Sequence, residues 1–89
     1  MKAIVTVLGK DKVGIIARVT VKLAEHNINV LDISQTILDG NFTMVMAVDM
    51  ALCTESFGSI KATLHALGED MGLEIRIQRT EIFDAMHTI

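Results

Sequence analysis

The stretch NVLDISQTILDGNFTMVMAVDM, residues 29–50, decides the fold of this chain. Residues 29–38 alternate between apolar and polar side chains, as a β-strand does. One face of this predicted strand holds Leu31, Ile33 and Ile37, and the other holds Asp32, Ser34 and Thr36. The next predicted strand, residues 42–50, carries on one face Phe42, Met44, Met46, Val48 and Met50. Asp39 and Gly40 lie between them and predict a tight hairpin, because glycine readily supplies the positive φ that such turns require.

A strand and a helix are predicted before the hairpin. Residues 3–8 are short, β-branched and followed by Gly9, which predicts a strand buried on most of both faces. The period then becomes helical, with apolar side chains at Ile15, Ile16, Val19 and Leu23. Asn27 is suited to close this helix in the left-handed conformation.

A helix and a strand are predicted after the hairpin. Spacings of three and four connect the apolar residues Phe57, Ile60, Leu64, Leu67 and Met71, the best periodic signal in the chain. Thr54 or Ser56 can cap the start of this helix, and Gly72 can close it. Residues 73–79 alternate again and predict a fourth strand, and residues 80–89 place Ile82, Phe83 and Met86 at helical spacing.

Two βαβ halves joined by a hairpin predict an α+β, ferredoxin-like fold. Right-handed crossovers interleave the halves into an antiparallel sheet of order 4-1-3-2 with both helices on one face. We expect one domain over residues 1–89, with a βαββαβ core at 1–80 and a short helix at 81–89. The uncovered sheet face mixes apolar and polar residues: Ile4, Leu8, Val45 and Ala47 with Thr6, Asp32, Thr43 and Arg76. The terminal helix and a second subunit are the two candidates to cover it.

The composition excludes several function classes. The 89 residues carry a formal charge of −3 with dispersed basic residues, so nucleic acid is not expected as a partner. One Cys and three scattered His predict neither a disulfide nor a metal site, and no cofactor is expected. No apolar run reaches the ~18 residues of a membrane span, and a lone thiol without an export signal predicts the cytoplasm. The sequence shows no catalytic constellation.

A family resemblance is carried by GKDKVGII at residues 9–16 and NINV at 27–30. These motifs resemble the ACT domain family, small-molecule regulatory modules that bind chiefly amino acids, and the resemblance covers residues 2–79. LDISQT at 31–36 and IFDAM at 82–86 resemble the short stand-alone ACT proteins, and the chain is more distantly similar to one half of the glycine cleavage system repressor. The family usually has Pro at the position of Val13, which predicts a less rigid loop here.

The resemblance implies a ligand site at a homodimer interface, built from the first loop and the start of the second strand. Its residues are Asp11, Lys12, Val13, Gly14, Ile15 and Asn29. The N-terminus of the first helix suits the carboxylate of an amino acid, Gly14 lets the ligand approach, and Asp11 and Asn29 can serve its polar groups. An ACT protein without a catalytic domain acts on another protein, whose identity the sequence does not show.

Simpler interpretations of the same residues remain open at this point. Asp11 can be a helix cap, Gly14 can allow close packing of helix and strand, and Asn29 can be a turn residue. The Met residues are expected in the core, or else on an adaptable surface. The alternative function is a ligand-free dimerisation and interaction module, and a weaker one is a phosphate-handling enzyme that uses Lys10 and Lys12.

Overall fold

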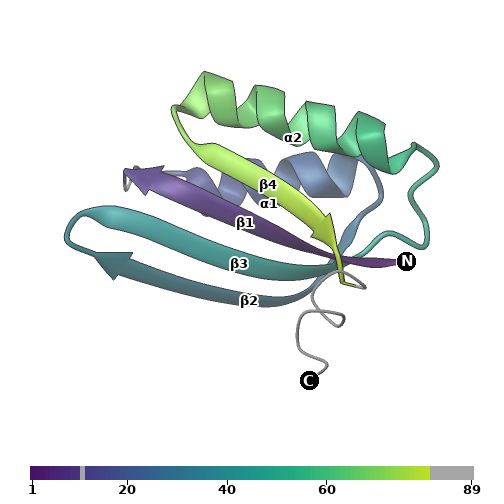
Figure 1. Cartoon of the computed structure of the whole chain (residues 1–89), viewed down its shortest axis with the longest axis horizontal. Helices are drawn as coiled ribbons and strands as arrows, with labels where there is room; N and C mark the ends of the chain where they lie inside the picture. Colours follow the sequence, from purple (N-terminus) through teal and green to yellow (C-terminus); the bar gives the residue numbers. More distant parts are fainter. Residues whose placement is uncertain (11, 81–89) are drawn as a thin grey trace.

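The chain has the predicted βαββαβ order in a computed structural model that describes residues 1–10 and 12–80. Its elements are β1 (Lys2–Lys10), α1 (Ile15–Glu25), β2 (Asn29–Leu38), β3 (Asn41–Asp49), α2 (Phe57–Met71) and β4 (Glu74–Arg79) (Figure 1). The four strands form one antiparallel sheet of order β2-β3-β1-β4, which confirms the predicted order. The predicted terminal helix at 81–89 lies outside the described residues.

The β2–β3 hairpin turns at Asp39 and Gly40, as predicted. Both residues have positive φ, 54° and 77°, and the turn brings Leu38 opposite Asn41. At the other end of the sheet Asn29 pairs with Asp49, which in turn pairs with Lys2. The hairpin turn therefore sets the register of β2 against β3 up to the irregularity between Val30 and Asp32.

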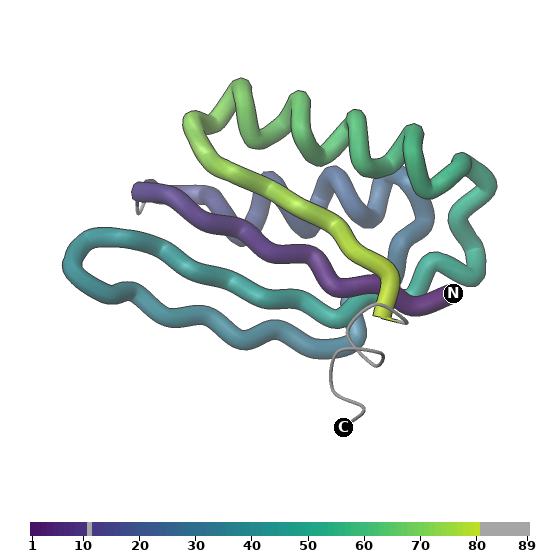
Figure 2. Tube along the Cα trace, viewed as in Figure 1, coloured from purple at the N-terminus to yellow at the C-terminus, as the bar shows by residue number. Residues whose placement is uncertain are grey.

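One hydrophobic core lies between the sheet and both helices. The strands contribute buried residues from one face, among them Ala3, Val5 and Val7 of β1 and Ile75 and Ile77 of β4. The helices contribute from α1 Ile15, Val19 and Leu23, and from α2 Ile60, Leu64, Leu67 and Met71. Met44, Met46 and Met50 are also buried in this core, so the interpretation of these residues as an adaptable surface is wrong. Both helices pack on the same face of the sheet, as Figure 2 lets the reader trace.

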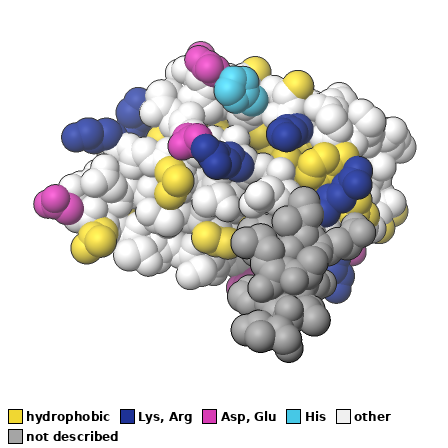
Figure 3. Space-filling view, in the orientation of Figure 1, with side chains coloured by type: hydrophobic (Ala, Val, Ile, Leu, Met, Phe, Trp, Pro, Cys, Tyr) yellow, Lys and Arg dark blue, Asp and Glu magenta, His cyan; other side chains and the backbone are white. Residues whose placement is uncertain are grey.

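The prediction that β1 is buried on most of both faces is wrong. Ile4 and Thr6 are half-buried and Leu8 is 38% exposed, because both described helices, α1 and α2, pack on the other face. This open face shows separate hydrophobic side chains among basic, acidic and uncharged ones (Figure 3). Its β-branched and leucine residues made β1 look like a strand buried on both faces.

A β-bulge in β2 interrupts the predicted alternation. Val30 pairs with Val48 and Asp32 with Ala47, so Leu31 has no partner in the register. Ile33 and Ile37 lie opposite core residues of β3 and face the helix side, as their spacing indicates. Leu31 does not share their alternation, contrary to the prediction, because the extra residue shifts the strand by one position.

The ends of α2 follow the predicted signals. Ser56 is the N-cap, and its Oγ accepts a hydrogen bond from the Ser59 N–H at 3.1 Å. Gly72 closes the helix at φ 70°. Asn27, at φ 59°, ends the turn after α1 in the left-handed conformation, also as predicted. Neither helix is long and apolar enough to cross a membrane, and this statement is limited to the described part of the chain.

Candidate ligand-binding site

The first loop ends at Gly14, which is the N-cap of α1. Gly14 has φ 87° and ψ 6°, a left-handed conformation, and its carbonyl accepts the first helical hydrogen bond from the Arg18 N–H at 2.9 Å. A Cβ added at Gly14 would meet no atom of residues 1–10 and 12–80 within 4 Å. The interpretation that Gly14 permits close packing of helix and strand is therefore wrong within this chain. Its positive φ and the open space before it are the two features the structure shows.

The start of α1 presents backbone N–H groups without a side-chain cap. No cap hydrogen bond is made at this end among the described residues, and the first turn carries no acidic side chain. The N-cap position belongs to Gly14 and not to Asp11, which itself lies outside the described residues. Such a helix end carries a partial positive charge and suits an anion.

The other loop residues have three different environments. Lys12 Nζ donates a hydrogen bond to the Met71 carbonyl at 2.6 Å, at the C-terminal end of α2. Val13 is fully exposed, whereas Ile15 is buried in the core. Lys12 thus ties the loop to α2, which also directs its ammonium group away from the role of phosphate ligand. Ile15 anchors the loop from the other side.

Asn29 lies exposed at the start of β2, beside a small hollow. The hollow has a volume of about 350 Å³ and is lined by Asn27, Ile28, Asn29, Asp49, Ala51 and Leu52. One carboxylate oxygen of Asp49, Oδ1, accepts a hydrogen bond from the Ala51 N–H at 3.0 Å, which shapes the loop that forms one wall. The position is open to solvent or to a neighbouring molecule.

The first loop and Asn29 lie at opposite ends of the sheet. The loop follows Lys10, which pairs with Asn41 near the hairpin, whereas Asn29 pairs with Asp49 near Lys2. Eight residue steps along β1 correspond to about 27 Å. Figure 2 shows the end of β1 and the start of β2 at the two ends of the molecule. The structure does not bring the predicted site residues together within one chain.

Strand β2 connects these two ends and is an edge strand. Every one of its residues except Val30 is exposed. Ile33 and Ile37 are 40% and 57% exposed although they face the helix side of the sheet. The sequence predicted both that β2 lies at the edge of the sheet and that it carries apolar residues. Taken together, these two predictions indicate an exposed apolar edge that can pair with another chain, and the sequence analysis did not draw this conclusion.

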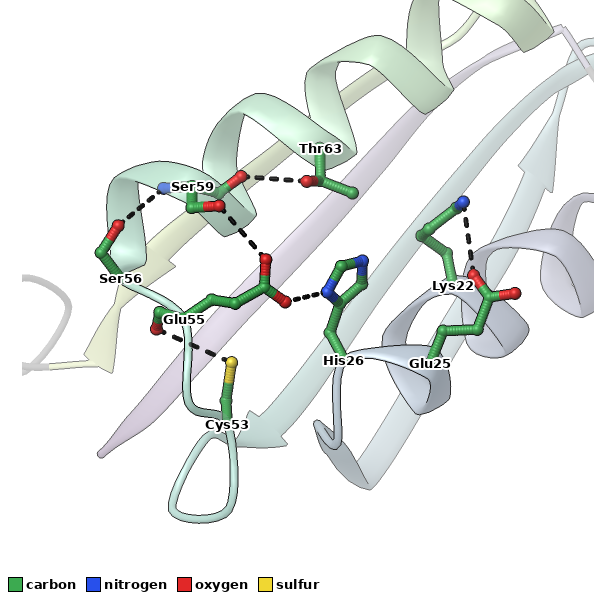
Figure 4. A network of polar contacts seen from close by, with 8 residues as sticks. All are labelled: Lys22, Glu25, His26, Cys53, Glu55, Ser56, Ser59 and Thr63. Carbon is green, nitrogen blue, oxygen red and sulfur yellow. Dashed lines mark hydrogen bonds and ion pairs between the residues drawn. The ribbon is translucent and has the colours of Figure 1, made fainter.

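A polar network elsewhere ties the two helices together. His26, after α1, forms an ion pair through Nδ1 with Glu55, which also accepts a hydrogen bond from Ser59 at 3.3 Å (Figure 4). Cys53 is a half-buried free thiol whose Sγ lies 3.8 Å from the Glu55 carbonyl oxygen. No group of three or more His, Cys, Asp or Glu that could hold a metal occurs within residues 1–10 and 12–80. We assign this network to the support of the loop before α2.

Comparison with known proteins identifies the family. The ACT domain model matches residues 2–78. The chain belongs to the ACT domain family. ACT domains are generally regulatory modules that bind small molecules, and the edge strand, the open glycine loop and the βαββαβ core described above are features of this ACT domain.

Stand-alone relatives match over their full length. A UPF0237 protein of Bifidobacterium longum is 58% identical over 99% of this chain and 98% of its own, and its name assigns no enzymatic activity. The structure of an ACT domain protein from Streptococcus pneumoniae superposes with a TM-score of 0.85 at 45% identity, covering 98% of both chains.

The resemblance to one half of a repressor also holds for the fold. A candidate glycine cleavage system transcriptional repressor superposes with a TM-score of 0.72 at 22% identity. The match covers 86% of this chain and 44% of that protein. At this identity the likeness concerns the fold alone.

Proposed function

We propose that this ACT domain is a non-catalytic regulatory module of the cytoplasm that binds an amino acid at a homodimer interface and acts on another protein. Each site combines the first loop of one subunit, Asp11, Lys12, Val13, Gly14 and Ile15, with Asn29 of the partner subunit. The observation that supports the proposal is that Lys10, after which the first loop begins, and Asn29 lie at opposite ends of the sheet, which an exposed edge strand connects.

Antiparallel pairing of two β2 strands about a twofold axis accounts for this placement. Such pairing puts the start of one β2 beside the end of the other, and therefore brings Asn29 of the partner subunit to the end of the sheet where the first loop lies. It also supplies partners for the free backbone groups of an edge strand and covers the exposed Ile33 and Ile37. Two equivalent sites per dimer follow from the symmetry.

The chemistry of the loop fits the two charged groups of an amino acid. The N–H groups at the start of α1, which no described side chain caps, suit the carboxylate, and the open space at Gly14 lets it approach the backbone. In the proposal the Asp11 carboxylate accepts a hydrogen bond from the ammonium group of the ligand. The Asn29 side-chain amide donates a hydrogen bond to the ligand or accepts one from it. Lys12 holds the loop through Met71, and Val13 contributes an apolar contact from its exposed side chain.

Thermal unfolding against each of the twenty amino acids at millimolar concentration tests this proposal. A ligand that binds only the folded state stabilises it by about 2.7 kcal/mol at a hundredfold excess over its Kd, which shifts the Tm by several degrees. We expect a shift with one or two amino acids, and its loss in Asp11→Ala and in Asn29→Ala. The matched control variants Asp39→Ala and Asn41→Ala, in the hairpin, should keep it.

The absence of a shift for all twenty amino acids would favour the ligand-free interaction module. In that case β2 still forms the dimer, and the fully exposed Val13 becomes a contact for a protein partner. Equal loss of the shift in the hairpin controls would show that the variants act through general stability and not through the site.

A further inference from the structure

The open face of the sheet has an apolar centre and polar margins. Cross-strand partners share a face, so the register aligns Gln78 of β4, Ile4 of β1, Ala47 of β3 and Asp32 of β2 in one row across it. The next row holds Arg76, Thr6, Val45 and Ser34. The two central strands therefore contribute the apolar members of both rows, and the two edge strands contribute polar ones. Such a surface suits a narrow amphipathic cover.

The chain continues beyond β4 at one end of this face. Arg79 pairs with Ala3, and the Thr80 hydroxyl donates a hydrogen bond to the Lys2 carbonyl at 3.2 Å. Residues 81–89 follow Thr80 in the sequence, and Gln78, two residues before Thr80, belongs to the row with Ile4 on the open face. A segment that begins here needs no linker to reach the open face of its own sheet.

The sequence of residues 81–89 fits that surface in pattern and length. At 100° per residue, four apolar side chains fall within about 120° of a helix circumference, namely Ile82, Phe83, Met86 and Ile89. Nine helical residues span about 13.5 Å. The distance across the sheet from β4 to β2 is three strand spacings, about 14 Å. One helix of this length therefore crosses all four strands.

We propose that residues 81–89 form an amphipathic helix that lies across the open face of their own sheet, with Ile82, Phe83 and Met86 on Ile4, Val45 and Ala47. Glu81 and Asp84 then lie on the solvent side. This cover occupies the face that a second subunit could otherwise use, and it leaves the β2 edge as the surface for dimerisation. The proposal concerns a surface separate from the ligand site, so each can fail without the other.

Cysteine accessibility in the full-length chain tests the cover. In a Cys53→Ser background, Val45→Cys places a thiol on the open face and Val21→Cys places one on α1. The described residues leave these two valines similarly exposed, 41% and 56%, so a sheet without a cover predicts similar rates of reaction with a maleimide. We expect the thiol at position 45 to react at least about tenfold more slowly than the one at position 21.

Variants of the terminal segment identify the occupant. Phe83→Asp should raise the rate at position 45 about tenfold and leave the rate at position 21 unchanged, while Thr88→Asp, on the polar side of the helix, should change neither. Far-ultraviolet circular dichroism checks that all variants stay folded. Equal rates at positions 45 and 21 in the parent would overturn the proposal. A slow reaction at position 45 that Phe83→Asp does not change, and that becomes slower as the protein concentration rises, would also overturn the proposal, because a second copy of the chain would then cover the face.

Discussion

At Gly14 the backbone conformation and the open space around the residue have separate consequences. Gly14→Ala keeps the contacts of the chain intact but forces an L-residue into φ 87°, which costs about 1 to 2 kcal/mol of unfolding free energy. Gly40→Ala is the matched control, because Gly40 has φ 77° and an equally open Cβ position. We expect urea unfolding to show similar losses for both variants, but only Gly14→Ala to weaken amino-acid binding, by at least about tenfold. Equal binding in the two variants would remove Gly14 from the site.

At the start of α2 the structure decides between two capping candidates. Thr54 and Ser56 both match the sequence signal for an N-cap. Of the two, only the Ser56 hydroxyl accepts a hydrogen bond from a backbone N–H of the helix, that of Ser59. Ser56→Ala should therefore lower the free energy of unfolding by about 1 kcal/mol, and Thr54→Ala by no more than a few tenths. Urea unfolding of the two variants measures both values. A larger loss at Thr54 would contradict the cap assignment.

At the scale of single elements, β2 is where local pattern and tertiary context differ most. The sequence predicted its bounds, its hairpin and the inward positions of Ile33 and Ile37. It did not show the bulge at Leu31. A strand that contains one extra residue has the same kinds of side chains as a regular strand, so its sequence gives no signal for the bulge. It also did not show how exposed the strand is, since exposure depends on which elements lie beside it. The end of α1 and both ends of α2 were easier to predict, because caps and positive-φ residues are local signals.

The exposed inner face of β2 gives a direct test of the dimer edge. Ile37→Lys puts a charged side chain where the partner strand would cover an apolar one, and the cost of removing that charge from water should raise the dimer dissociation constant about a hundredfold, the equivalent of about 2.7 kcal/mol. Val21→Lys is the matched control: Val21 is 56% exposed against 57% for Ile37, but it lies on α1 beside Arg18 and Leu67. Sedimentation equilibrium should find the control dimeric. Dissociation of both variants, or of neither, would exclude β2 as the interface.

The link between α1 and α2 through His26 and Glu55 belongs to the same scale. These side chains are 23% and 37% exposed, so their ion pair is only partly shielded from solvent. A double-mutant cycle with His26→Ala and Glu55→Ala should give a coupling free energy of about 0.5 to 1 kcal/mol at low salt, and less at 1 M salt. The more exposed pair of His65 and Glu69, both 73% exposed, should give a smaller coupling free energy. No coupling at either salt concentration would limit the pair to a packing role.

At the scale of the whole molecule, the sequence defines the proposed site only as a set of residue types. The loop motif and Asn29 were identified by resemblance, and the fold was confirmed, but a strand of nine residues separates the two parts. Linear spacing carries no information on a partner subunit. The topology supplies the missing step, because it places both parts beside the two ends of an exposed edge strand.

Subunit mixing tests whether the site is shared. Asp11→Ala alters the loop half of each proposed site, and Asn29→Ala alters the half that the partner subunit supplies, so neither variant alone binds. In a heterodimer of the two, one site carries both changes and the other carries none. After random exchange half of the dimers are mixed, and about a quarter of all sites should regain amino-acid binding, which isothermal titration calorimetry can count. A site contained within one chain would regain none, whatever the ratio of the two variants.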